Sequence, residues 1–94
     1  MASAFQTLVK KHYEEQGYKV FKVIKLSENG YPDLMCLKSG QSIFIECKEA
    51  NDTLKPLQKI RIDELIGNGF IAFAIQKGKG IIYGTHHHTA PSNW

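Results

Sequence analysis

The sequence predicts an α/β fold, a small mixed β-sheet flanked by helices in the order α-β-β-β-α-β-β. Apolar runs on either side of Ser39-Gly40 indicate a β-hairpin, because Ser-Gly is a plausible two-residue turn. A helical pattern follows the hairpin and leads into the apolar run 70–75, which indicates a buried central strand. A strand-helix-strand crossover implies parallel pairing, so one sheet is expected to hold parallel and antiparallel strands.

Length and composition predict one domain with a small core, because the chain has 94 residues and a hydrophobic share of 43%. We expect the domain to span 1–84 and to be followed by a tail, 85–94, that shows no periodicity. A domain of this size is often completed by a second subunit, so a homodimer is expected. No signal peptide or apolar run of about 18 residues is visible, so we expect a cytoplasmic protein with no membrane contact.

The first helix is expected to begin after Ser3, whose side chain can cap it together with Gln6, and to end at Gly17. Its apolar stripe at helical spacing consists of Phe5, Leu8, Val9, His12 and Tyr13. A strand over 18–26 is expected next. Lysines on both faces of this strand place it near an edge of the sheet, where charge discourages pairing with other chains.

The hairpin is expected to pair strands 33–38 and 41–48. A two-residue turn fixes the register, and counting back from it sets Asp33 directly opposite Glu46. Because side chains alternate along a strand, Lys48 lies on the same face as Glu46. The open end of the hairpin therefore gathers two carboxylates and an ammonium group.

Opposed like charges are unfavourable, and a hard divalent cation between Asp33 and Glu46 would offset them. A lysine beside such a site can hold a phosphate or activate an attacking water, which suits metal-assisted phosphodiester hydrolysis. Glu-x-Lys alone is a common pattern on exposed strands, and Gly-x-Pro-Asp alone is a common turn. The matched positions of Asp33 and Glu46 on the two strands favour the site over these plainer interpretations.

The sequence Gly30-Tyr31-Pro32-Asp33, followed after twelve residues by Glu46-Cys47-Lys48, resembles the signature of the PD-(D/E)xK nuclease superfamily. It is similar in particular to that of the small VRR-NUC domains, in which a Ser/Thr-Pro-x-Gln-like segment starts the second helix; this chain has Leu54-Lys55-Pro56-Leu57-Gln58 there. The resemblance runs from about residue 5 to about residue 75. It implies a restriction-endonuclease-like core and a divalent-metal-dependent DNA endonuclease that selects branched DNA, such as a four-way junction. A stand-alone domain this short is typical of phage and other mobile genomes.

The resemblance also implies roles for individual residues. Asp33 and Glu46 would ligate Mg²⁺ or Mn²⁺, and the backbone carbonyl of Cys47 would supply another oxygen. Lys48 would stabilise the phosphate and position or activate the water. Gln58 would support the site by positioning water or phosphate, and an ordinary amide on the helix surface is an equally good interpretation of it.

The first helix departs from the family pattern. Relatives place a glutamate near its start as a third carboxylate; alignment on Gly17 puts Ala2 there, and no acid precedes Glu14. Glu14 and Glu15 lie about two turns or more further along, near the C-terminal end of the helix, and are poor substitutes. This departure favours an alternative, a non-catalytic nucleic-acid-binding domain that retains the nuclease fold. A structural or assembly subunit is a third possibility.

The second helix is expected to start at Pro56 and to end at 67–69, and a basic turn, 76–80, leads into a last strand, 81–83. The net charge is +3, and lysine acts on phosphate as a point charge, which favours recognition of the DNA backbone or shape. The candidate DNA contacts are Lys59, Arg61, Lys77 and Lys79. A plain solvated turn is the alternative for 76–80. The histidines at 86–88 lack the spacing of a preorganised metal site.

Overall fold

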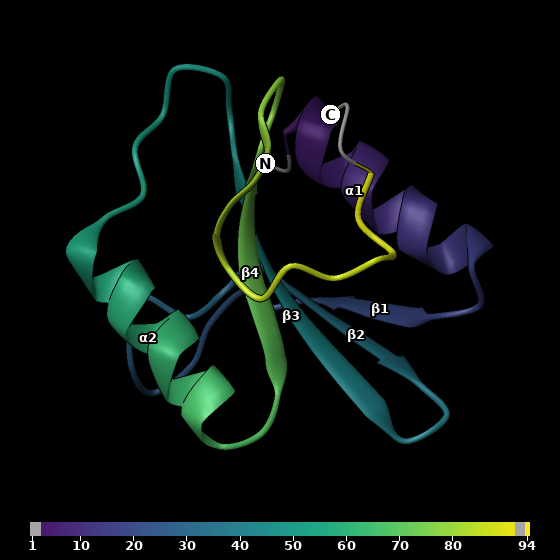
Figure 1. Ribbon diagram of the computed structural model, residues 1–94, viewed down its shortest axis with the longest axis horizontal. Helices are drawn as coiled ribbons and strands as arrows, with labels where there is room; N and C mark the ends of the chain where they lie inside the picture. Colours follow the sequence, from purple (N-terminus) through teal and green to yellow (C-terminus); the bar gives the residue numbers. More distant parts are fainter. Residues whose placement is uncertain (1–2, 92–93) are drawn as a thin grey trace.

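The computed structural model describes residues 3–91 and 94. Their elements are α1 (Ala4–Glu15), β1 (Lys19–Lys22), β2 (Leu34–Lys38), β3 (Gln41–Lys48), α2 (Pro56–Gly67), β4 (Ile71–Gln76) and β5 (Gly80–Gly84) (Figure 1). The predicted α-β-β-β-α-β-β order is confirmed. Within the described residues, neither helix is long and apolar enough to cross a membrane.

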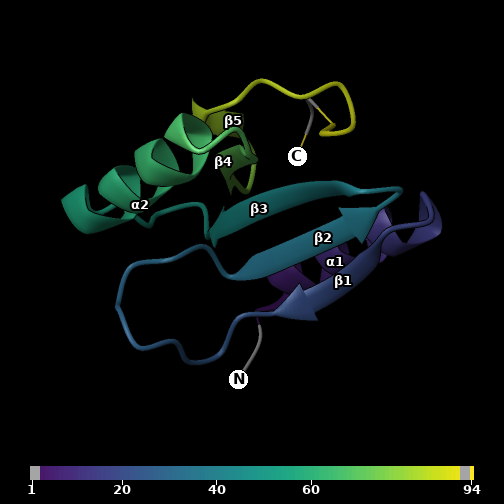
Figure 2. The same ribbon diagram turned by 90° about the horizontal axis from the view of Figure 1, so that it is seen from below.

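All five strands form one sheet whose spatial order follows the chain, β1-β2-β3-β4-β5. β3 and β4 pair in parallel, and the other neighbours pair antiparallel, so the predicted mixed sheet and crossover are confirmed. The two helices lie on opposite faces of the sheet (Figure 2). α1 packs against β1 and β3, and α2 packs against β4 and β5.

Each helix covers its own apolar cluster. The larger cluster joins Phe5, Val9 and Tyr13 of α1 to the sheet residues Leu34, Cys36, Ile43, Ile45, Phe73 and Ile75. The smaller cluster joins Ile62 of α2 to Leu54, Ala72 and Ala74. The helical spacing predicts one side of α2 from Leu57, Ile60, Glu64 and Leu65, widened by Ile62 and Ile66. This prediction was partly wrong, since Leu57, Ile60 and Ile66 are substantially exposed and Ile62 is the buried residue of the helix.

The hairpin has the predicted turn and register. Its ladder runs from Lys38 opposite Gln41 back to Leu34 opposite Ile45. Both turn residues have positive φ, 49° at Ser39 and 78° at Gly40, as a two-residue turn requires in order to match the twist of its strands. Asp33 directly precedes Leu34 and therefore lies at the Glu46 end of β3.

The strand predicted over 18–26 is shorter than expected, since only Lys19–Lys22 pair with β2. It lies at the sheet edge, as predicted. The backbone N–H of Val23 donates to the Asp33 carbonyl at 2.7 Å, so the chain between these two residues leaves the sheet and returns as a loop. Within this loop Ile24 is 90% exposed, and an apolar side chain in that position adds nothing to the core.

The segment after β5 returns across the molecule to α1 (Figure 1). The hydroxyl of Thr89 donates to the Tyr13 hydroxyl at 3.0 Å, and a ring nitrogen of His12 lies 2.8 Å from the Thr89 carbonyl. Trp94 packs edge-on against Phe5, with ring centroids 5.9 Å apart. Described residues of the predicted tail thus pack on the domain; positions 1, 2, 92 and 93 of the predicted ranges lie outside the described residues.

Candidate active site

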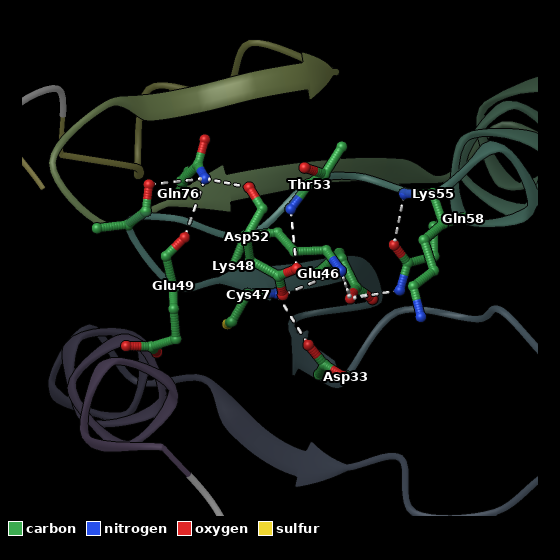
Figure 3. Close-up of polar contacts among 11 residues, drawn as sticks. Asp33, Glu46, Cys47, Lys48, Glu49, Asp52, Thr53, Lys55, Gln58 and Gln76 are labelled. Atoms are coloured by element: carbon green, nitrogen blue, oxygen red, sulfur yellow. Dashed lines mark hydrogen bonds and ion pairs between the residues drawn. The ribbon is translucent and has the colours of Figure 1, made fainter.

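The hairpin brings the predicted acidic residues and Lys48 together. Asp33 directly precedes β2, while Glu46 and Lys48 lie in the last three residues of β3. The backbone N–H of Cys47 donates to Asp33 Oδ2 at 2.9 Å, which holds the two strands together at this end. Glu46 and Lys48 are each only 4% exposed. Their charged groups converge at the end of the hairpin (Figure 3).

The Lys48 ammonium group lies between two carboxylates. Its Nζ is 3.6 Å from Glu46 Oε2 and 3.6 Å from Asp52 Oδ2. Glu46 belongs to β3, whereas Asp52 belongs to the polar connection that follows it. In the sequence Asp52 stands in a polar stretch, 49–53, and spacing alone does not identify it as a neighbour of Lys48.

Gln58 links the first turn of α2 to the site. Its Nε2 donates to Glu46 Oε2 at 3.1 Å, and its Oε1 accepts from the backbone N–H of Lys55 at 2.9 Å. One amide therefore caps the helix and orients the buried carboxylate. This geometry favours the supporting role over the ordinary surface amide.

Burial raises the pKa of both site acids, and the negative charge of Asp33 adds to this effect at Glu46. Burial is the main cause that raises the pKa of Glu46 to about 8; the negative charge of Asp33 adds to it, and Lys48 acts in the opposite direction. Burial also raises the pKa of Asp33, against the lowering effect of the Cys47 N–H and Lys48. A cation bound between these groups would favour their ionised forms.

Comparison with known proteins assigns the chain to a family. A family model of the VRR-NUC domain matches residues 2–77, which include the candidate site residues Asp33, Glu46, Lys48 and Gln58. The chain belongs to the VRR-NUC domain family. The resemblance inferred from the hairpin motif is confirmed, and the family assignment makes the chain a nuclease domain.

Two solved structures resemble this VRR-NUC domain. A structure described as a VRR-NUC domain is 28% identical, with a TM-score of 0.66 over 74% of this chain and 77% of that one. Hjc of Archaeoglobus fulgidus, a Holliday junction resolvase, is 17% identical, with a TM-score of 0.59 over 76% of this chain and 65% of that one. The second likeness shows a shared restriction-endonuclease-like fold, as predicted. A search of curated proteins found no match.

The donors of this VRR-NUC domain fit a hard divalent cation that keeps much of its water. Mg²⁺ is commonly held by one or two carboxylates, with water and phosphate oxygens completing its six ligands. Asp33 supplies a half-buried carboxylate and Glu46 a buried one. Among the described residues no group of three or more His, Cys, Asp or Glu side chains could hold a metal by itself. The first turn of α1 has no acid, and Glu14 pairs with Lys10 at 2.8 Å.

The four predicted DNA contacts of the VRR-NUC domain are placed differently. The backbone N–H of Lys77 donates to the Lys48 carbonyl at 2.9 Å, so the turn that carries Lys77 and Lys79 lies at the site end of the sheet. The Lys59 ammonium lies 5.7 Å from the Tyr83 ring centroid, on the α2 side. Arg61 is engaged within the protein, so a contact with phosphate would require it to leave its present partners.

Those partners of Arg61 tie the loop after β1 to α2. Its Nε donates to the Asn29 carbonyl at 2.8 Å, and its guanidinium lies 4.8 Å from the Tyr31 ring centroid. The same group pairs with Glu64 at 2.7 Å and with Glu28 at 3.6 Å. Arg61 thus holds the segment that enters the site at Asp33.

Gln76 is the second residue near the site that sequence reasoning missed. It ends β4, is 4% exposed and pairs with Lys48 across the β3–β4 ladder. Its Nε2 lies 2.9 Å from the Glu49 carbonyl, 3.3 Å from that of Ala50 and 2.7 Å from that of Asp52. A glutamine at the end of an apolar run resembles any strand terminus, so the sequence contains no signal for this contact.

Proposed function

We propose that this VRR-NUC domain is a divalent-metal-dependent DNA endonuclease. The observation that carries the proposal is the pair of Asp33, which is half-buried, and Glu46, which is buried, with the buried Lys48 beside them at the end of one hairpin. A nuclease domain acts on nucleic acid, and a net charge of +3 is compatible with a DNA backbone. An intracellular setting, where DNA and Mg²⁺ are present, belongs to the same proposal.

Each site residue has a task in phosphodiester hydrolysis. Asp33, Glu46 and the backbone carbonyl of Cys47 would hold Mg²⁺ or Mn²⁺. When bound, such an ion lowers the pKa of a coordinated water and offsets the charge of the phosphate. As the water oxygen bonds to phosphorus and one ester oxygen departs, the Lys48 ammonium donates to a non-bridging oxygen, where negative charge develops. Gln58 keeps Glu46 oriented through its 3.1 Å hydrogen bond.

The proposed substrate is branched DNA, such as a four-way junction. The fold shared with the Hjc resolvase supports this choice by analogy. Lys77 and Lys79, at the site end of the sheet, and Lys59 on α2 are proposed to contact phosphates. Lysines favour recognition of backbone and shape over base sequence.

A homodimer belongs to this proposal because one sheet face is partly open. α2 packs on β4 and β5. Phe21, Met35 and Leu37 share that face further along the sheet, and Phe21 is 42% exposed. A second copy on this face would cover these apolar side chains, and two-fold symmetry would present two sites to a symmetric junction.

The cleavage test compares a labelled four-way junction with a linear duplex of the same arms, in Mg²⁺, Mn²⁺ or EDTA. We expect metal-dependent cutting that favours the junction and falls by at least about 10²-fold in Asp33→Asn and Lys48→Met, because each change removes a group that acts on the transition state. Lys10→Met is the matched control, since it removes a lysine charge from the outer side of α1. Equal cutting by wild type and Lys48→Met would overturn the assignment of Lys48.

The dimer is tested by light scattering. Wild type is expected at twice the chain mass, and Phe21→Glu is expected at the chain mass, because a buried unpaired carboxylate opposes the interface. Ile82→Glu, the same change at an exposed apolar residue of β5, is the control and should remain dimeric. A wild type that is monomeric and still cuts junctions would show that the nuclease activity does not require a dimer.

The second candidate function is a non-catalytic DNA-binding domain, and the absence of an acid in the first turn of α1 favours it. Under this alternative the protein binds DNA in a salt-dependent manner but does not cut it in either metal, and Lys48→Met alters affinity only slightly. A structural subunit, the third possibility, would show no salt-dependent binding. Cleavage and salt-dependent binding, measured on the same wild-type and Lys48→Met proteins, therefore distinguish the nuclease, the DNA-binding domain and the structural subunit.

A further inference from the structure

The position of the Lys48 ammonium group depends on more than its own strand. A lysine head group is a point charge on a flexible four-carbon stem, so its partners determine where it lies. One partner, Glu46, is fixed by β3 and by Gln58. The other, Asp52, lies on the connection between β3 and α2. With equal distances of 3.6 Å to both carboxylates, Nζ lies between a strand and a loop.

The two oxygens of Asp52 have separate partners. Oδ1 accepts from the backbone N–H of Thr53 at 2.8 Å, and Oδ2 faces Lys48. The Thr53 contact fixes the rotation of the carboxylate and therefore the direction from which it attracts the ammonium. The Asp52 side chain is 52% exposed, so an ion pair of this kind contributes little to the free energy of unfolding. An effect of Asp52 is therefore expected in catalysis rather than in stability.

The loop that carries Asp52 is held by Gln76. Three carbonyls of the loop, those of Glu49, Ala50 and Asp52, surround the Gln76 side-chain nitrogen. Carbonyls only accept hydrogen bonds, so the NH₂ group is the end of the amide that fits there. Gln76 lies directly beside Lys48 in the β3–β4 ladder, and this register fixes the loop relative to the lysine.

We propose that Asp52 and Gln76 are positioning residues for Lys48: Gln76 holds the loop, the loop presents Asp52, and Asp52 with Glu46 holds Nζ where the phosphate is bound. This inference rests on the proposed function, because it assigns the means by which Lys48 is placed for that chemistry. Neither residue touches the reacting atoms.

The test is a double-mutant cycle on single-turnover cleavage of the labelled junction in Mg²⁺. Asp52→Asn keeps the acceptor for Thr53 and removes the charge that faces Lys48. We expect it to slow cleavage by about tenfold or more, since a misplacement of about 1 Å can cost about 10²-fold, and to leave the DNA dissociation constant unchanged. In a Lys48→Met background the same change should cause no further loss, because there is no ammonium group to position.

Glu49→Gln is the matched control, since it removes an exposed acid from the same loop and keeps the backbone carbonyl that Gln76 contacts. Its cleavage rate should equal that of wild type. If Asp52→Asn slows cleavage by the same factor with and without Lys48, or not at all, the positioning role is wrong while the nuclease assignment stands. If wild type and Lys48→Met cut equally, the proposed function of Lys48 fails instead.

A readout that does not require cleavage follows the loop itself. Gln76→Met keeps the length of the side chain and removes its hydrogen bonds to the three carbonyls. Amide hydrogen exchange at Thr53 should become about tenfold faster or more in this variant, while exchange within β2 stays unchanged. Unaltered exchange at Thr53 would contradict the anchoring step. The Asp52→Asn cycle tests the Lys48 step even if Gln76→Met does not fold.

Discussion

Glu46 is an acid placed where water is scarce, and this affects how the protein responds to pH. Its side chain is buried next to Asp33, and its pKa rises from the ordinary 4.5 to about 8. The folded, metal-free chain therefore holds a proton that the unfolded chain has lost between those two values. Since the folded state binds more protons in this window, its free energy of unfolding falls as pH rises. The pKa of Asp33 is also raised, so Asp33 likewise lowers the free energy of unfolding as the pH rises above the pKa that this residue has in the unfolded chain.

We predict that the urea midpoint of unfolding in EDTA falls as the pH is raised from about 5 to about 8. Glu46→Gln should remove most of this slope, because an amide does not titrate. At about pH 8, Mg²⁺ should raise the midpoint of wild type and not that of Glu46→Gln, since the metal replaces the proton on the ionised acid. An unchanged slope in Glu46→Gln, or a changed slope in the exposed control Glu15→Gln, would contradict this account.

At the scale of elements, the segment from Val23 to Asp33 behaves as an extension of the site. The Val23 N–H bond to the Asp33 carbonyl closes the base of this loop. Arg61 ties its far side to α2 through the Asn29 carbonyl. The loop therefore connects α2 to Asp33, and the hydrogen bond of Gln58 connects α2 to Glu46.

Arg61→Met should loosen this loop without disrupting the core, because the guanidinium contacts that the loop uses are lost and the side-chain stem remains. Limited trypsin digestion at Lys25 is expected to become several-fold faster, since proteolysis follows the population of locally opened chains. Lys59→Met, which removes a charge from the same helix outside the loop contacts, serves as the control. Equal digestion rates in the two variants would show that Arg61 is not the tether.

At the scale of the whole molecule, the segment after β5 completes the cover of the larger core. Ala90 and Trp94 pack against the α1 cluster, and the Gly80 N–H donates to the Trp94 carbonyl at 3.0 Å. A domain of this length has few apolar residues to spare, so each additional contact is a large part of its stability.

Trp94→Ala is predicted to lower the free energy of unfolding by about 1–3 kcal/mol, which corresponds to roughly 4–8 °C in Tm for each kcal/mol. The control is His86→Ala, because His86 is exposed and lies in the same segment. Circular dichroism follows both variants without relying on the indole signal. A Trp94→Ala midpoint equal to that of wild type would mean that this packing contributes nothing to stability.

Short-range sequence patterns predicted the hairpin, because its turn and register depend on residues that are close together in the chain. Ser39-Gly40 set the length of the turn, the turn set the register, and the register placed Asp33 at the end of β3 that holds Glu46. Gln58 reaches the site from a helix, Asp52 from a loop and Gln76 from the neighbouring parallel strand, and no short-range pattern encodes these approaches. Of these three residues, the family resemblance indicates only Gln58.

The apolar face of α2 shows the same limit. The helical spacing predicts one side from Leu57, Ile60 and Leu65, with Ile62 only widening it, whereas the packing of α2 on β4 makes Ile62 the buried residue. The predicted strand over 18–26 ended early for a related reason. Its pattern could continue, but β2 begins at Leu34 and offers no partner beyond Lys22.

The agreement between strand order and chain order has a consequence for how the protein folds. Every strand pairs with its neighbour in sequence, so most of the sheet forms from contacts of short separation, and low contact order favours fast folding. A hairpin closes in about 1–10 μs, whereas the β3–β4 pairing must wait for the α2 crossover. We therefore expect Asp33 and Glu46 to meet early, in a folding nucleus built on β2 and β3, and to be joined later by Gln58 and Gln76.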